Sequence, residues 1–244
     1  MRLDHASWFE VEAYLKRSRG IIIPTGSTEQ HGPIGLIGTD AICAEKIAEN
    51  AGNIASALVA PTLAYTPAPF NMEFPGTISI SPPLYQSLVL EIVEGLIGQG
   101  FTYIYFLNGH GANLAPLQFV SKKTVAANIR IKSWWEFDPV NELRQNYYGD
   151  WEGMHATPSE IAITQATHRI IESDLAATPP EKLTKAFMRE HAGDRHGPAE
   201  QHKKSFPDGR VGSHSALARP EHGIKLLEAA SVAVAADFVS FNAL

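Results

Sequence analysis

The chain has 244 residues, a formal net charge of −6 and one cysteine. Its 44% hydrophobic and 19% charged residues are typical of a globular domain and exclude a disordered or fibrous chain. A net negative charge, with no cluster of lysines and arginines along the chain, argues against a nucleic-acid-binding surface. No apolar run reaches the roughly 18 residues of a membrane span, and no signal-peptide core is present. We therefore expect one cytoplasmic domain over residues 1–244, with no membrane partner. Cys43, inside an amphipathic segment, is expected to be buried and unreactive.

Short apolar strands alternate with amphipathic helices in the first part of the chain. This alternation indicates βαβ units and a mainly parallel sheet. Strands are predicted at 20–24, 57–61, 101–107 and 129–137, and helices at 7–17, 41–50, 81–97 and 114–128.

The last hundred residues are less regular. Helices are predicted at 157–172 and 220–242, and residues 189–215 form a polar excursion between them, expected to be a lid or a subunit contact. Four histidines lie in this excursion without the tight spacing of metal ligands, which predicts that they are solvated: His191, His196, His202 and His214.

Three side chains that commonly bind metals lie in a glycine-rich loop between the first strand and its helix: Glu29, His31 and Asp40. A fourth, His110, follows the strand at 101–107. Because open α/β sheets bind ligands beyond the carboxyl ends of their strands, we expect the two loops to meet. Two carboxylates and two imidazoles suit Zn²⁺ or Mn²⁺. The two oxygens of Asp40 would allow it to bridge a pair of ions.

Each of these residues also has a simpler interpretation. Asp40 stands where the following helix would take an N-cap residue. A lone Glu29 or His31 on a loop is commonly solvated, and His110, between two glycines, could hydrogen-bond a turn. Their gathering on two loops at one sheet edge favours the metal site.

A second cluster runs from Trp151 to Glu160. Thr157-Pro-Ser-Glu160 has the form of a capping box, so Glu160 is open between a helix cap and a metal ligand. His155 could serve as a general acid toward a leaving nitrogen. Trp151 could stack on a flat substrate or simply pack.

Four sequence blocks resemble the creatininase (creatinine amidohydrolase) family in order and spacing, from about residue 18 to 165. They are Gly26-Ser-Thr-Glu-Gln-His-Gly-Pro, Gly38-Thr-Asp, Phe74-Pro-Gly-Thr and Asn108-Gly-His-Gly-Ala-Asn. The resemblance implies a three-layer α/β/α sandwich with a mainly parallel central sheet, assembled as a homohexamer. It also implies two divalent ions, Zn²⁺ or Mn²⁺, and hydrolysis of a non-peptide, often cyclic, amide C–N bond in a small molecule such as creatinine.

The resemblance further implies a role for each candidate ligand. Glu29 and His110 would bind one ion. His31 would bind the other together with Glu160, and Asp40 would bridge the two.

The remaining matches concern the reaction and its substrate. His155 corresponds to a catalytic histidine of the family and Trp151 to a substrate-facing tryptophan. Three positions depart from the family pattern and count against creatinine itself as the substrate. They are Gly111 and Ala112, where creatininase has a tyrosine and a ligating glutamate, and Asn71, where many members have histidine.

The sequence thus favours an amidohydrolase in which His155 or Glu160 carries the proton to the leaving nitrogen. Two other functions stay open. One is a biosynthetic hydrolase, either a formylaminopyrimidine deformylase or an enzyme that cleaves a C–C or peptide bond. The other is a non-catalytic metal-binding or nucleotide-binding module, whose nucleotide version is weakened by the absence of a Gly-x-Gly-x-x-Gly motif and of a Walker-type lysine.

Overall fold

A four-stranded parallel sheet lies at the centre of the computed structural model, which describes residues 1–243. Its strand order is β2-β1-β3-β4, with β1 at Gly20–Thr25, β2 at Leu58–Val59, β3 at Tyr103–Asn108 and β4 at Asn128–Ser133. β1 and β3 are neighbours, and their last residues, Thr25 and Asn108, stand opposite each other. The loops that follow these two strands therefore start side by side.

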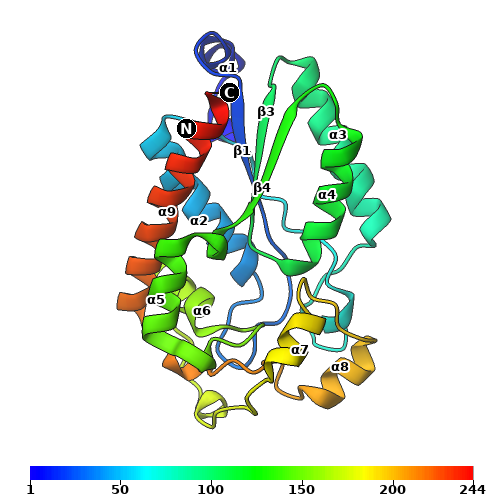
Figure 1. Cartoon of the computed structure of the whole chain (residues 1–244), viewed down its shortest axis with the longest axis vertical. Helices are drawn as coiled ribbons and strands as arrows, with labels where there is room; N and C mark the ends of the chain where they lie inside the picture. The colour runs from blue at the N-terminus through cyan, green and yellow to red at the C-terminus, as the bar shows by residue number, and fades with distance from the viewer. Residues whose placement is uncertain (244) are drawn as a thin grey trace.

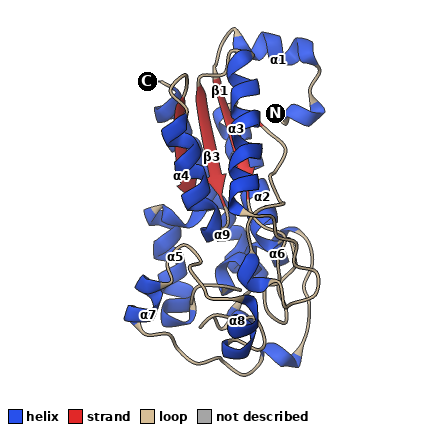
Figure 2. Cartoon of the chain, turned by 90° about the vertical axis from the view of Figure 1, so that its right-hand side faces the viewer, coloured by secondary structure: helices blue, strands red, loops and turns tan. Residues whose placement is uncertain are grey.

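Helices cover both faces of the sheet (Figure 1). One face carries α2 (Thr39–Ala55), α5 (Asp138–Tyr148), α6 (Pro158–Thr167) and α9 (Pro220–Asn242), and the other carries α1 (Trp8–Leu15), α3 (Pro82–Gly98) and α4 (Leu114–Lys123). Two short helices, α7 (Lys185–Glu190) and α8 (Ala199–Ser205), lie beyond the carboxyl ends of the strands (Figure 2). This arrangement confirms the α/β sandwich expected from the sequence.

The central strands are buried on both faces, which explains why they are continuously apolar. Successive side chains of a strand point to opposite sides. Ile22 of β1 accordingly joins the core beneath α2 and α9, whereas Ile21 and Ile23 join the core beneath α3. Cys43 of α2 is fully buried in the first of these cores, as predicted.

The predicted elements differ from the observed ones mainly at their ends. Only two residues of the strand predicted at 57–61 form a strand. The helices predicted at 114–128 and 157–172 end early, at Lys123 and Thr167, and the strand predicted at 129–137 ends at Ser133. Helix α5 was not predicted. It is largely polar and buries only Val140 and Tyr148, so few apolar residues mark it in the sequence. Within residues 1–243, none of the helices has the length and apolarity needed to cross a membrane.

Candidate active site

The loops after β1 and β3 meet at the first turn of α2, and two glycines make this approach possible. A Cβ atom at Gly26 would lie 2.3 Å from the backbone nitrogen of Ala41, and one at Gly109 would lie 2.4 Å from the carbonyl oxygen of Asp40. Any larger residue at either position would therefore push α2 away from the sheet. The glycines of both loops thus bring Asp40 to the common edge of the strands.

Asp40 lies inside α2 and not at its N-cap, which is Gly38. Its Oδ1 is 2.9 Å from Nε2 of His31. Its Oδ2 is 2.9 Å from Nδ1 of His110 and accepts a hydrogen bond from the Ser27 hydroxyl, also at 2.9 Å. Each carboxylate oxygen of Asp40 therefore faces a different histidine.

Three imidazoles of the site are each held by a backbone carbonyl. His31 Nδ1 donates to Glu29 at 3.0 Å, His110 Nε2 to Pro67 at 2.8 Å and His155 Nε2 to Gln30 at 2.7 Å. A carbonyl oxygen only accepts, so in each neutral ring the second nitrogen carries the lone pair. Those second nitrogens face the carboxylates. This is the arrangement in which a histidine ligates a metal ion.

Glu29 is fully buried, and only one of its two carboxylate oxygens accepts a hydrogen bond. Its Oε2 accepts a hydrogen bond from the side-chain amide of Asn71 at 3.0 Å. Its Oε1 lies 3.3 Å from His110 Nδ1 and 3.6 Å from His155 Nδ1, yet within residues 1–243 no atom donates a hydrogen bond to it. An unpaired, buried carboxylate oxygen is costly unless a cation lies against it. Glu29 thus fits a metal ligand better than a solvated loop residue.

Glu160 has the helix-capping role that the sequence offered, and its carboxylate also lies near the candidate metal ligands. It forms the capping box of α6, because its Oε1 accepts from the Thr157 N–H at 2.5 Å and its own N–H donates to Thr157 Oγ1 at 3.3 Å. The same Oε1 lies 3.9 Å from Nε2 of His31. Capping orients the carboxylate toward the histidine cluster.

Three groups of side chains have ligand atoms close enough to hold a metal ion. They are Glu29, Asp40 and His110; His31, Asp40 and Glu160; and Glu29, His31 and His155, with the ligand atoms of each group within 4.8 Å of one another. The first two groups share Asp40 and correspond to the division of ligands implied by the family resemblance. All of these residues are buried.

Burial and close charges shift the pKa values of these groups. Burial raises the pKa of Glu29 to about 7 and that of Glu160 to about 8. Burial lowers the pKa of His31, but the adjacent Asp40 carboxylate outweighs it and the pKa is about 10. The pKa of His155 is held well below its ordinary value by burial and by the nearby His31. Without a cation, the site therefore retains protons that an ion would displace.

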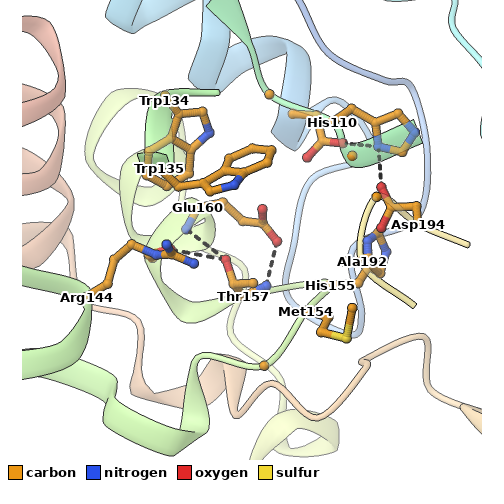
Figure 3. Close-up of a pocket in the computed structure, with 16 residues that line it drawn as sticks. His110, Trp134, Trp135, Arg144, Met154, His155, Thr157, Glu160, Ala192 and Asp194 are labelled. Atoms are coloured by element: carbon orange, nitrogen blue, oxygen red, sulfur yellow. Dashed lines mark hydrogen bonds and ion pairs between the residues drawn. The ribbon is translucent and has the colours of Figure 1, made fainter. Parts of the chain in front are cut away.

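A cavity of about 230 Å³ opens onto this cluster. Asp40, His110, His155 and Glu160 line it. Figure 3 shows Trp134, Trp135 and Arg144 on one side of the cavity and His110 and Asp194 on the other. The site can thus hold a small molecule against the ligand cluster.

The structure places Trp151 outside this cavity. Its ring packs edge-on against His214, with a centroid distance of 5.6 Å, and the amino group of Lys182 lies 4.5 Å above it. Trp135 and Arg144 occupy the cavity wall instead. The role of Trp151 in substrate binding stays a prediction that these contacts do not support.

The polar excursion covers the site, and two of its histidines were wrongly predicted to be solvated. The His196 side chain is 2% exposed and His202 is 3% exposed. Both rings pack against Phe70, with centroid distances of 4.8 and 5.1 Å. The excursion also brings Asp194 to the cavity, a residue that no sequence motif indicated.

Comparison with known proteins identifies the family of the chain. Residues 4–238 match the creatininase family model, described as creatinine amidohydrolase. The chain is 37% identical over 103 residues to the mycofactocin precursor peptide peptidase of Mycolicibacterium smegmatis, an alignment covering 40% of this chain and 41% of that protein. It is 31% identical over 103 residues to the 3-dehydro-scyllo-inosose hydrolase of Thermotoga maritima, covering 42% and 33% respectively. The alignments therefore span less than half the length of these curated relatives.

A solved structure described as "Creatininase Mn" has the same fold, with a TM-score of 0.76, 20% sequence identity and 98% of each chain covered. The family match extends over nearly the whole chain and agrees with this likeness of fold. This chain is therefore a member of the creatininase family of hydrolases.

Proposed function

We propose that this chain is a metal-dependent amidohydrolase that binds two divalent ions, Zn²⁺ or Mn²⁺, and adds water to an amide C–N bond of a small molecule. The observation that carries the proposal is the position of Asp40. One oxygen faces His31 and the other faces His110, so two groups of ligands share one carboxylate. A shared carboxylate is typical of two-ion hydrolytic centres.

The charges of the site support bound cations. Glu29, Asp40 and Glu160 are buried, and within residues 1–243 their only ion-pair partners are histidines. Buried carboxylates without a lysine or arginine partner need either protons or metal ions. Imidazole nitrogens and carboxylate oxygens are the ligands that Zn²⁺ and Mn²⁺ accept.

We propose that His155 moves the proton in this reaction. When bound, the ions would lower the pKa of a water molecule and polarise the amide carbonyl. The lowered pKa of His155 keeps its imidazole neutral at pH 7. The carbonyl of Gln30 fixes the Nε2–H, so Nδ1 is the atom that can take a proton and pass it to the leaving nitrogen. Glu160, with a pKa of about 8, is the second candidate for this step.

Peptide-bond hydrolysis is a second candidate, favoured by the 37% identity to a precursor peptide peptidase. The same ligands and the same histidine would serve it, because both reactions break an amide C–N bond. The homohexamer implied by the family resemblance is a further prediction, which light scattering of the purified protein tests.

Product analysis tests the function. Metal-stripped protein reloaded with Zn²⁺ or Mn²⁺ would be incubated with creatinine, other cyclic amides, N-formyl pyrimidines and short peptides, and the products identified by mass spectrometry. Asp40→Asn protein and a chelated sample are the controls. Metal-dependent addition of water to one compound supports the proposal and identifies the bond class. Tight metal binding without turnover of any compound contradicts it and favours a binding role.

A further inference from the structure

The segment between α7 and α8 places a carboxylate at the metal-ligand cluster. Ala192, Gly193 and Asp194 line the cavity, and Figure 3 shows the Asp194 side chain directed at His110. The packing of His196 and His202 on Phe70 holds the segment against the body of the protein. The Asp194 side chain is 11% exposed.

Asp194 reaches the same nitrogen atom as two of the candidate ligands. Its Oδ2 lies 3.5 Å from Nδ1 of His110. That Nδ1 is also 2.9 Å from Asp40 Oδ2 and 3.3 Å from Glu29 Oε1. Nε2 of His110 is engaged with the Pro67 carbonyl, so Nδ1 is the free ligand atom of the ring. Three carboxylates thus converge on one imidazole lone pair.

The loop after β3 is shaped to admit Asp194. The backbone N–H of Ala112 donates a hydrogen bond to Asp194 Oδ2 at 3.0 Å, which fixes the direction of the carboxylate. A Cβ atom at Gly111 would lie 2.4 Å from this same oxygen. Only glycine at position 111 leaves the carboxylate room to approach His110.

Protein charges do not balance this gathering of carboxylates. Within residues 1–243, the ion-pair partners of Asp194 are His110 and His196, whose Nε2 is 3.9 Å from Oδ1. Glu29 Oε1, on the same side of the cluster, is buried and receives no hydrogen bond from any described residue. A protonated imidazole supplies one positive charge against three carboxylates, whereas a divalent cation supplies two and accepts several oxygen ligands at once.

We propose that Asp194 is an additional ligand of the ion held by Glu29, Asp40 and His110. The inference rests on the proposed metal-dependent function and goes beyond it, because the ligand comes from the segment that covers the cavity. The ligand set of this ion is then complete only while the segment between α7 and α8 packs in place. The ion held by His31 and Glu160 does not depend on that segment.

Metal affinity measured without substrate tests the proposal. Metal-stripped wild type, Asp194→Asn and Gly111→Ala proteins would be titrated with Zn²⁺ against a chromophoric chelator, which resolves the two binding steps. Glu190→Gln is the matched control, because it removes one negative charge from an exposed position at the end of α7, directly before this segment. Far-UV circular dichroism of the metal-free proteins verifies that each variant is folded.

We expect Asp194→Asn to weaken one binding step roughly 100-fold, as for the loss of one ligand among four, and to leave the other step and the control unchanged. Gly111→Ala should weaken the same step by displacing Asp194, and the double variant should bind as Asp194→Asn does. In the Co²⁺-loaded protein, Asp194→Asn should change the visible absorption of one ion.

Normal affinity for both ions in Asp194→Asn would overturn the inference but leave the proposed function standing. A wild type that binds no divalent ion would overturn both. If the double variant bound the ion more weakly than Asp194→Asn does, Gly111 would not act through Asp194, contrary to the inference.

Discussion

Replacing Asp40 by asparagine tests the central feature of the proposed site, the carboxylate shared by two ligand groups. Asparagine has nearly the same shape and still offers one oxygen, which can accept the hydrogen bond from Ser27. It loses the negative charge shared by the two oxygens that face His31 and His110, and one of these oxygens becomes an amide NH2 group, so neither ion keeps a carboxylate ligand from position 40. The change therefore acts on the ligands and leaves the packing of α2 intact.

The expected loss of metal affinity can be worked out from the share of the metal-binding free energy that each ligand contributes. A four-ligand structural zinc site contributes about 10–16 kcal/mol, or about 3 kcal/mol per ligand. Each 1.4 kcal/mol corresponds to a factor of ten, so the loss of one ligand weakens binding roughly 100-fold. Because Asp40 belongs to both groups, Asp40→Asn should weaken both binding steps by about this factor. Glu29→Gln and Glu160→Gln should each weaken only one step, and not the same one.

Chelator competition at pH 7, with metal content measured after gel filtration, gives the two affinities for each variant. Asp150→Asn is a suitable control, because the side chain of Asp150 is 82% exposed. If Asp40→Asn weakened a single step, or if Glu29→Gln and Glu160→Gln affected the same step, the idea of a bridging Asp40 would be refuted.

Three further predictions concern catalysis, pH dependence and packing. His155→Gln should lower kcat by about 10²–10⁴-fold while both ions stay bound, and parallel loss of metal in an elemental analysis would contradict a catalytic role. Between pH 6.5 and 8 the metal-free protein should lose stability as the pH rises. The pKa values of Glu29 (about 7), Glu160 (about 8) and His31 (about 10) are raised, as is that of His110, so in this range the folded state holds protons that the unfolded state has released. The slope should be about 1.4 kcal/mol per pH unit for each proton still held, with a smaller contribution from Glu29 above pH 7. Urea unfolding should show this slope disappearing when metal is bound, and an equal slope with and without metal would argue against ligation by these four residues. Gly26→Ala should destabilise the protein by about 1–3 kcal/mol through steric overlap with the backbone of α2. Thermal unfolding should show no such loss for Gly95→Ala, where a Cβ atom has nothing within 4 Å.

Much of the candidate site could be predicted from the sequence because it depends on chain order. Parallel strands end at one edge of a sheet, so Glu29, His31 and Asp40 after one strand and His110 after its neighbour had to approach each other. The structure brings these four side chains together.

The parts that could not be predicted depend on tertiary packing. The position of Trp151 is set by its contacts with His214 and Lys182, both from distant segments. Asp194 reaches the cluster because the segment that carries it packs on Phe70, more than a hundred residues away in the chain. Neither side chain has a local sequence pattern that reports its position.

The structure also shows what residues 111 and 112, which depart from the family pattern, do in this chain. Gly111 leaves space for the Asp194 carboxylate, and the Ala112 N–H hydrogen-bonds to it. The sequence showed only that two side chains expected from the family were missing.

The backbone carbonyls that hold the three histidines suggest how one centre could serve different substrates during evolution. Carbonyl groups are common to every residue, so substitutions at Glu29, Gln30 or Pro67 do not delete the acceptors that orient the rings. The opposite wall of the cavity is made of side chains such as Trp135 and Arg144, which mutation can exchange freely. Substrate specificity can therefore change through mutation of the cavity wall while the carbonyl groups that orient the histidines are retained.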